Sequence, residues 1–146
     1  MAPTITGDNL GAWLVKGNPE TSSDLPSWIQ VGGTVVRSWC VVPGYRAEMM
    51  AAGDRVILWV SGNGRRVARG IWGMGHVTGP VEEMGPKPSV PLHLPLLDQP
   101  VPAHDLVAAG ITDLEVQRMP QGSNPSWVSR HQLARLMPLL PPWPDH

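Results

Sequence analysis

The chain alternates between short apolar runs and clusters of proline, glycine and polar residues. Three runs in the first half, residues 12–15, 34–42 and 55–60, are apolar or β-branched and predict strands. The third is apolar from its second residue onward, which is typical of a strand buried on both faces. Residues 62–64 (GNG) favour a hairpin turn, because glycine and asparagine accept positive φ at low cost, so residues 67–77 are predicted to return as a fourth strand.

The second half of the chain has weaker strand signals. Residues 90–97 predict a fifth strand, although Pro91 and Pro95 restrict it to a sheet edge or to an interrupted ladder, because proline lacks a backbone donor. Residues 114–119 predict the last strand. The sequence therefore predicts about six short strands.

Short helices separate these strands. Ser129 and Gln132 fit the capping box, in which each side chain satisfies the other residue's backbone donor. A helix is therefore predicted to start at Ser129 and to stop at Pro138. Other helical segments, each next to proline or glycine, are predicted at residues 25–30, 45–52 and 103–109.

Elements this short fit a single α+β domain. Closing a sheet into a barrel removes exposed edges, which suits a chain of 146 residues. We therefore expect an α+β fold, a mixed β-barrel of about six strands with short flanking helices. Residues 1–10 are expected to be a flexible N-terminus, residues 11–137 the domain, and residues 138–146 a proline-rich C-terminal tail extended against it.

Composition restricts the class of protein. The chain has one cysteine, Cys40, so it holds no internal disulfide, and no apolar run approaches the roughly 18 residues of a membrane span. The first residues do not resemble a secretory signal, so a cytoplasmic location without membrane contact is expected. The formal net charge is −1, but residues 25–81 hold six arginines against two acidic residues. That excess leaves two interpretations open, a basic face or an ordinary solvated surface of mixed sign.

The chain shows no catalytic constellation. Its five histidines include no pair at zinc-ligand spacing on one helix, and no glycine loop followed by lysine and serine or threonine would cradle a phosphate. Cys40 has no obvious base nearby in the sequence, and a buried inert thiol is expected. We therefore expect a protein that is not an enzyme and that uses no metal and no cofactor.

Four segments carry a resemblance to a known family. They are residues 13–20 (WLVKGNPE), 53–62 (GDRVILWVSG), 70–77 (GIWGMGHV) and 121–125 (QGSNP). In this order and spacing, the chain resembles the EVE domain, which has a PUA-like fold and is related to the YTH domain. The resemblance covers roughly residues 11–137.

The resemblance implies a pocket that receives one base turned out of its stack. EVE domains are thought to read modified bases such as methylated or hydroxymethylated cytosine in DNA, and YTH domains read methylated adenine in RNA. By this comparison Trp39 lies where YTH domains place a cage tryptophan, and Lys16, Gly17 and Asn18 lie where those domains contact the base edge. Residues 78–89 contain no second cage aromatic, which argues against a complete methyladenine cage.

A flipped base needs a flat apolar surface and polar partners for its Watson–Crick edge. The chain has seven tryptophans, one tyrosine and no phenylalanine, and Trp39 is the predicted stacking platform, with Trp59 as a second candidate. Core packing is the alternative for both rings. The predicted polar partners of the base edge are Asn18, Ser38, Ser123 and Asn124, of which the two asparagines precede proline and have turn formation as their alternative.

Arginines supply the predicted phosphate contacts, with solubility as their alternative role. They are Arg65, Arg66 and Arg69 beside the hairpin and Arg37 before Trp39. The expected function is a binding module for a flipped modified base, 5-methylcytosine or a related cytosine in DNA rather than RNA. One alternative is a protein-interaction scaffold in a defence or repair complex, which the near-neutral charge would suit. The other is a reader of modified RNA such as N6-methyladenine.

Overall fold

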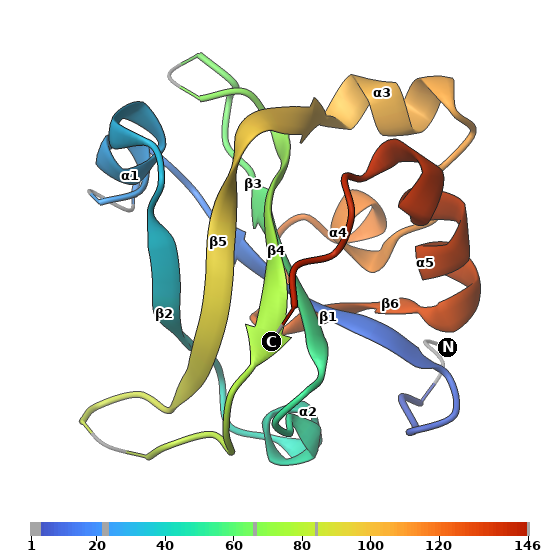
Figure 1. Ribbon diagram of the computed structural model, residues 1–146. Coiled ribbons are helices and arrows are strands. Elements are labelled where there is room, and N and C mark those ends of the chain that lie inside the picture. The colour runs from blue at the N-terminus through green and yellow to red at the C-terminus, as the bar shows by residue number, and fades with distance from the viewer. Residues whose placement is uncertain (1–3, 22–23, 66, 84, 146) are drawn as a thin grey trace.

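The computed structural model describes residues 4–21, 24–65, 67–83 and 85–145. These residues form a mixed α+β fold with one six-stranded sheet in the order β2-β5-β4-β3-β1-β6 (Figure 1). β1 runs parallel to β3, and the other neighbouring pairs are antiparallel. The strands are β1 Leu10–Gly17, β2 Val35–Cys40, β3 Arg55–Val60, β4 Gly70–Val77, β5 Ser89–Pro102 and β6 Ser126–Ser129. The helices are α1 Leu25–Val31, α2 Tyr45–Met49, α3 Ala103–Ala108, α4 Glu115–Arg118, α5 Arg130–Leu136 and the 3-10 turn η1 Met137–Leu139.

The sheet is open, so the predicted closed barrel is wrong. β2 forms one edge of the sheet and β6 forms the other. Among the described residues, the segments next to these edges share one backbone hydrogen bond, from the Val42 N–H to the Asn124 carbonyl at 2.9 Å. The next residues, Pro43 and Pro125, have no backbone donor with which to extend a ladder. Neither proline can therefore donate a further backbone hydrogen bond between the two edges.

The sheet carries a core on each face. Along β3 the side chains alternate, so that Val56 and Leu58 pack into one core and Ile57 and Trp59 into the other. This arrangement confirms the prediction that residues 55–60 are buried on both faces, because all but Arg55 are buried. The first core also contains residues of α1 and α2, whereas α3, α4 and α5 cover the second core (Figure 1).

β5 is longer than the sequence predicts and lies inside the sheet, between β2 and β4. The interrupted ladder expected from its prolines is present. The register with β2 shifts between Val36 and Ser38, and the register with β4 shifts between Ile71 and Gly73. These irregularities let proline occupy an internal strand without leaving a continuous row of unmatched acceptors.

The predicted last strand, residues 114–119, is wrong, because this segment contains the single-turn helix α4. The Gln117 side chain accepts from the Leu114 N–H at 3.0 Å and donates to the Ile111 carbonyl at 2.8 Å, which stabilises the turn locally. The actual last strand, β6, has only four residues and was not predicted. Its pairing with β1 is a long-range contact that no local pattern reveals.

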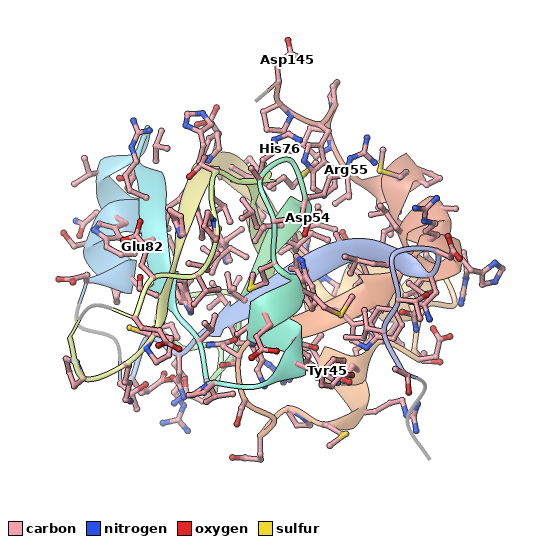
Figure 2. The ribbon with its side chains drawn as sticks, turned by 90° about the horizontal axis from the view of Figure 1, so that it is seen from below. Tyr45, Asp54, Arg55, His76, Glu82 and Asp145 are labelled. Atoms are coloured by element: carbon pink, nitrogen blue, oxygen red, sulfur yellow. The ribbon has the colours of Figure 1, made fainter. Side chains whose placement is uncertain are left out.

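The C-terminal helix α5 has the predicted capping box. The Gln132 N–H donates to the Ser129 hydroxyl at 3.1 Å, and the Ser129 N–H donates to the Gln132 side chain at 2.9 Å. The chain then passes through η1 into the tail, where the indole N–H of Trp143 donates to the Gly75 carbonyl at 3.0 Å. The Arg55 guanidinium lies 5.0 Å from the centre of the Trp143 ring. Figure 2 shows the tail end, near Asp145, on the same side as Arg55 and His76.

Candidate functional site

Trp39 lies near the end of β2 and is half-buried. Its ring atoms Cη2 and Cζ2 lie 3.2 Å from the point where a Cβ on Gly17 would stand. The Leu25 atom Cδ2 lies 2.9 Å from the same point. The absence of a side chain at Gly17 therefore lets the indole pack against the end of β1.

Asn18 follows Gly17 and closes a local turn. Its Oδ1 accepts from the Glu20 N–H at 2.9 Å, which is the turn role foreseen as its alternative. The Ser61 N–H donates to the Gly17 carbonyl at 2.9 Å, so the loop from β3 to β4 begins beside Trp39 and Asn18. Gly62, at φ 100°, faces the Asn18 and Glu20 side chains so closely that a Cβ would clash with both.

Asn124 binds the backbone of Lys16 rather than facing an open pocket. Its Oδ1 accepts from the Lys16 N–H at 2.8 Å, and its Nδ2 donates to the Lys16 carbonyl at 3.2 Å. The Lys16 ammonium donates to the carbonyls of Gly122 and Pro120. Burial lowers the pKa of Lys16, an effect that the nearby Glu115 carboxylate opposes. Lys16 and Asn124 thus hold residues 120–125 against β1, and neither has its polar groups directed to a base edge.

A hollow of about 330 Å³ lies next to this clamp. We call it the Tyr45 hollow, and its walls include Val42, Tyr45, Met119 and the predicted Ser123. Val42 and Tyr45 are each 48% exposed and Met119 is 57% exposed, so three large apolar side chains meet solvent at one place. Figure 2 shows Tyr45 projecting from α2 on the side of α4. Such a concentration is typical of a binding surface.

A two-pronged ion pair between α2 and α4 borders the Tyr45 hollow. Arg46 Nη1 and Nη2 donate to Glu115 Oε1 and Oε2 at 2.7 and 2.9 Å, and the Ser126 hydroxyl donates to Glu115 Oε1 at 2.9 Å. Burial by itself would raise the pKa of Glu115, but the hydrogen bonds from Arg46 and Ser126 outweigh it and hold that pKa below the ordinary value. The hydrogen bond with Glu115 likewise raises the pKa of Arg46. Both groups stay ionised, which suits binding rather than proton transfer.

The side chains of Trp59 and Ser38 do not lie on the same face of the sheet as Trp39. Trp59 is 3% exposed and packs into the second core, so it lies on the opposite face of the sheet from Trp39. The sequence alone does not determine which face of the sheet the Trp59 side chain occupies, because that depends on the register of its strand. Ser38 is exposed, whereas its neighbour Trp39 packs toward the first core, as strand alternation requires. Cys40 is also exposed, so the expected buried thiol is wrong.

The predicted phosphate contacts are spread over two regions. Arg37 is exposed on β2, with its Nη1 3.2 Å from His93 Nδ1. Arg65 is exposed in the loop that begins beside Asn18. Arg69 is exposed as well but borders a hollow on the face of the second core. Arg66 lies outside the described residues.

The sequence did not reveal Tyr45, Met119 or the pair Arg46 and Glu115. The two charged residues are 69 positions apart, so no local pattern links them. The one available signal was that the chain's single tyrosine directly follows a proline-glycine turn. Among the described residues, no group of three or more histidine, cysteine or acidic side chains gathers as metal ligands would. The described helices are all too short or too polar to cross a bilayer.

Two solved structures resemble nearly the whole chain. The NMR structure of Rpa0253 from Rhodopseudomonas palustris matches 89% of this chain and 92% of its own, with 19% identity and a TM-score of 0.59. The crystal structure of PSPTO5229 from Pseudomonas syringae matches 88% of this chain and 98% of its own, with 19% identity and a TM-score of 0.52. A scan against protein-family models and a search of curated proteins find no match. At this identity the likeness establishes the fold alone, and the chain shares the α+β fold of these two bacterial proteins.

Proposed function

We propose that the chain binds nucleic acid by receiving a single modified base, turned out of its stack, against Trp39. The preferred base is 5-methylcytosine or a related modified cytosine in DNA. The observation that carries this proposal is the half-buried Trp39 ring, packed over Gly17 and next to Asn18, although Trp39 is distant from both in the sequence. The resemblance to EVE domains placed these same residues at the base.

In such a reader, stacking and contacts to the base edge must together offset the cost of extruding the base. Stacking on an aromatic side chain contributes roughly 1–3 kcal/mol per base, whereas extruding the base costs a few kcal/mol. The methyl group of a modified cytosine adds about 0.8 kcal/mol if it is fully buried. Preference for the modified base is therefore expected to be moderate.

Polar groups near Trp39 complete the proposed contact. The Asn18 Nδ2 group can donate to an acceptor on the base edge while Oδ1 maintains the local turn. Arg37 and Arg65 are exposed on β2 and on the loop beside Asn18, where they can pair with the phosphates that flank the base. Lys16 and Asn124 support the site by fixing the end of β1.

The test is a fluorescence anisotropy titration with duplexes that differ only in methylation of one cytosine. The Trp39→Leu variant keeps an apolar side chain over Gly17 but loses the flat ring, whereas Trp39→Phe keeps a flat ring. We expect Trp39→Leu to weaken binding of the methylated duplex by about 5-fold to 150-fold, which corresponds to the loss of one stacked base, and Trp39→Phe to retain most of the affinity.

Equal affinities for the two duplexes, unchanged in Trp39→Leu, would defeat the proposal. RNA oligonucleotides with and without N6-methyladenine distinguish the alternative nucleic acid. A Tyr45→Ala variant tests whether the flipped base enters the Tyr45 hollow instead. In that case Tyr45→Ala would abolish binding, whereas Trp39→Leu would not.

A second candidate function is docking of a protein partner, in a defence or repair complex, at the Tyr45 hollow. The specific observation in its favour is the exposure of Val42, Tyr45 and Met119 around one hollow in a chain of net charge −1. Charged substitution at an apolar docking surface removes binding. Three results together would support this function over the first. The native protein would recover one defined protein partner, Tyr45→Asp would fail to recover it, and the native protein would show no salt-dependent binding of nucleic acid.

A further inference from the structure

A second hollow, of about 390 Å³, lies between the end of β3, α3 and α4. We call it the Trp59 hollow. Trp59, only 3% exposed, lines it together with the apolar side chains of Val107 and Val116, and Arg69 and His104 stand exposed at its rim. Figure 1 shows α3 and α4 on the same side of the sheet. Small-ligand pockets measure roughly 300–1,000 Å³ and are mainly apolar with a few polar groups, so this hollow has suitable dimensions and lining.

The indole N–H groups of the buried tryptophans differ in their hydrogen-bond partners. The buried Trp13 and Trp72 donate their indole N–H groups to Asp54 at 2.9 Å and to the Ala68 carbonyl at 2.8 Å. No described residue accepts a hydrogen bond from the Trp59 N–H, and this nitrogen is not sealed from solvent. Among the described residues, the buried Trp127 indole likewise has no acceptor. Because Trp59 lines the hollow, a ligand bound there can supply an acceptor in place of water.

The rim of the Trp59 hollow is positively charged. His104 lies 3.3 Å from the Asp105 carboxylate, which offsets its charge when it is protonated. For Arg69, no carboxylate of the described residues lies within ion-pair distance. The Gln117 amide in the wall uses both its ends on backbone groups. A ligand in this hollow would therefore meet an open indole N–H and an arginine that has no acidic partner.

We infer that the Trp59 hollow binds a flat aromatic ligand that carries a carboxylate. The ring packs on the exposed side chain of Val107, a carboxylate oxygen accepts from the indole N–H of Trp59, and Arg69 pairs with the negative charge. The inference does not rest on the proposed function, because Trp59 and Trp39 pack into cores on opposite faces of the sheet. Failure of one proposal leaves the other unaffected.

The experiment follows the indole N–H signals of ¹⁵N-labelled native protein by NMR while benzoate is added to millimolar concentration. The Trp59→Phe variant identifies the Trp59 signal by its loss, and the unchanged remaining indole signals show that this variant folds. We expect benzoate to move the Trp59 signal downfield in a saturable manner, because the N–H acquires an acceptor. Benzyl alcohol, the matched neutral compound, is expected to move it far less.

Two variants separate specific pairing from general charge. Arg69→Gln is expected to weaken benzoate binding by up to about fivefold, the usual range for an exposed ion pair. Arg118→Gln, an exposed arginine that does not line the hollow, is the matched control and should leave binding unchanged. A Trp59 signal that benzoate does not move, an equal response to benzyl alcohol, or equal losses in the two arginine variants would overturn the inference.

Discussion

At the scale of single residues, the packing of Trp39 depends on the glycine at position 17. Gly17 has no Cβ, and the Trp39 ring and the Leu25 side chain approach to within 3.2 and 2.9 Å of the point where one would stand. Packing, and not a special backbone angle, is what favours glycine at this position, because the φ of Gly17 is not in the left-handed region. The orientation of the proposed stacking platform therefore depends on one small residue at the end of β1, a strand that does not pair with β2 in the sheet.

The Gly17→Ala variant tests this dependence. The added methyl group would lie 3.2 Å from Trp39 ring atoms and 2.9 Å from the Leu25 side chain, so both must shift. We expect a loss of about 1–3 kcal/mol in the free energy of unfolding, measured in urea, and weaker binding of the methylated duplex. Gly7→Ala is the matched control, because no heavy atom lies within 4 Å of its added Cβ. Equal behaviour of the two variants would show that the contact does not fix Trp39.

At the scale of elements, the pair Arg46 and Glu115 connects α2 to α4 beside the Tyr45 hollow. Hydrogen bonds lower the pKa of Glu115 in the folded protein. The unfolded chain therefore binds a proton at higher pH than the folded protein does. The stability that this pair contributes is present above the ordinary glutamate value, about 4.5, and is lost as the pH falls through the lower folded value.

We expect the urea midpoint of the native protein to fall as the pH is lowered below about 4.5. The Glu115→Gln variant keeps the side chain shape but cannot titrate, so its decline over this range should be shallower, although its stability at neutral pH is lower. Glu48→Gln, at an exposed position of α2, is the matched control. Parallel pH profiles for the native protein and Glu115→Gln would contradict the assignment.

Local pattern predicted the elements whose signals are local. The apolar run of β3 and the capping box of α5 were both found from residues adjacent in the sequence. The helix α4 and the strand β6 were missed, because α4 depends on the hydrogen bonds of the Gln117 side chain and β6 on pairing with β1. The hydrophobic pattern alone could not distinguish a helix from a strand in segments as short as α4 and β6.

The candidate site likewise contains features that the sequence indicated and features that depend on tertiary packing. The resemblance assigned both Trp39 and Gly17 to the predicted base pocket, and the structure brings the Trp39 ring close to Gly17. The chemistry of an amide side chain suggested Asn124 for the base edge, whereas the Asn124 amide pairs with the backbone of Lys16. The face occupied by Trp59 and the ion pair across 69 residues depend on tertiary packing, so the sequence alone could not predict them.

At the scale of the whole molecule, an open sheet carries a core on each face, and residues of α4 line both the Tyr45 hollow and the Trp59 hollow. Trp143 in the tail packs against the second core, donates to the Gly75 carbonyl and lies under the Arg55 guanidinium. These contacts lie on the face opposite Trp39. The tail is therefore expected to contribute to stability without contributing to base binding.

The Trp143→Ala variant tests this separation. It removes a hydrogen bond, a cation–π contact and apolar burial, and we expect a loss of about 2 kcal/mol in the free energy of unfolding. Trp143→Phe keeps the ring but not the donor and should lose less. Affinity for the methylated duplex should be unchanged in both, as measured by anisotropy. A large loss of affinity in a folded Trp143→Ala protein would show that the two faces are coupled.

The central claim is that a base leaves its stack and lies on Trp39. Its most direct test is the NMR signal of a ¹³C-labelled methyl group on a single 5-methylcytosine in a duplex saturated with protein. We predict a pronounced upfield shift on binding, caused by the indole ring current, which persists in part in Trp39→Phe and disappears in Trp39→Leu. A methyl signal that stays at its free-duplex position, or that moves equally in native protein and Trp39→Leu, would contradict the account.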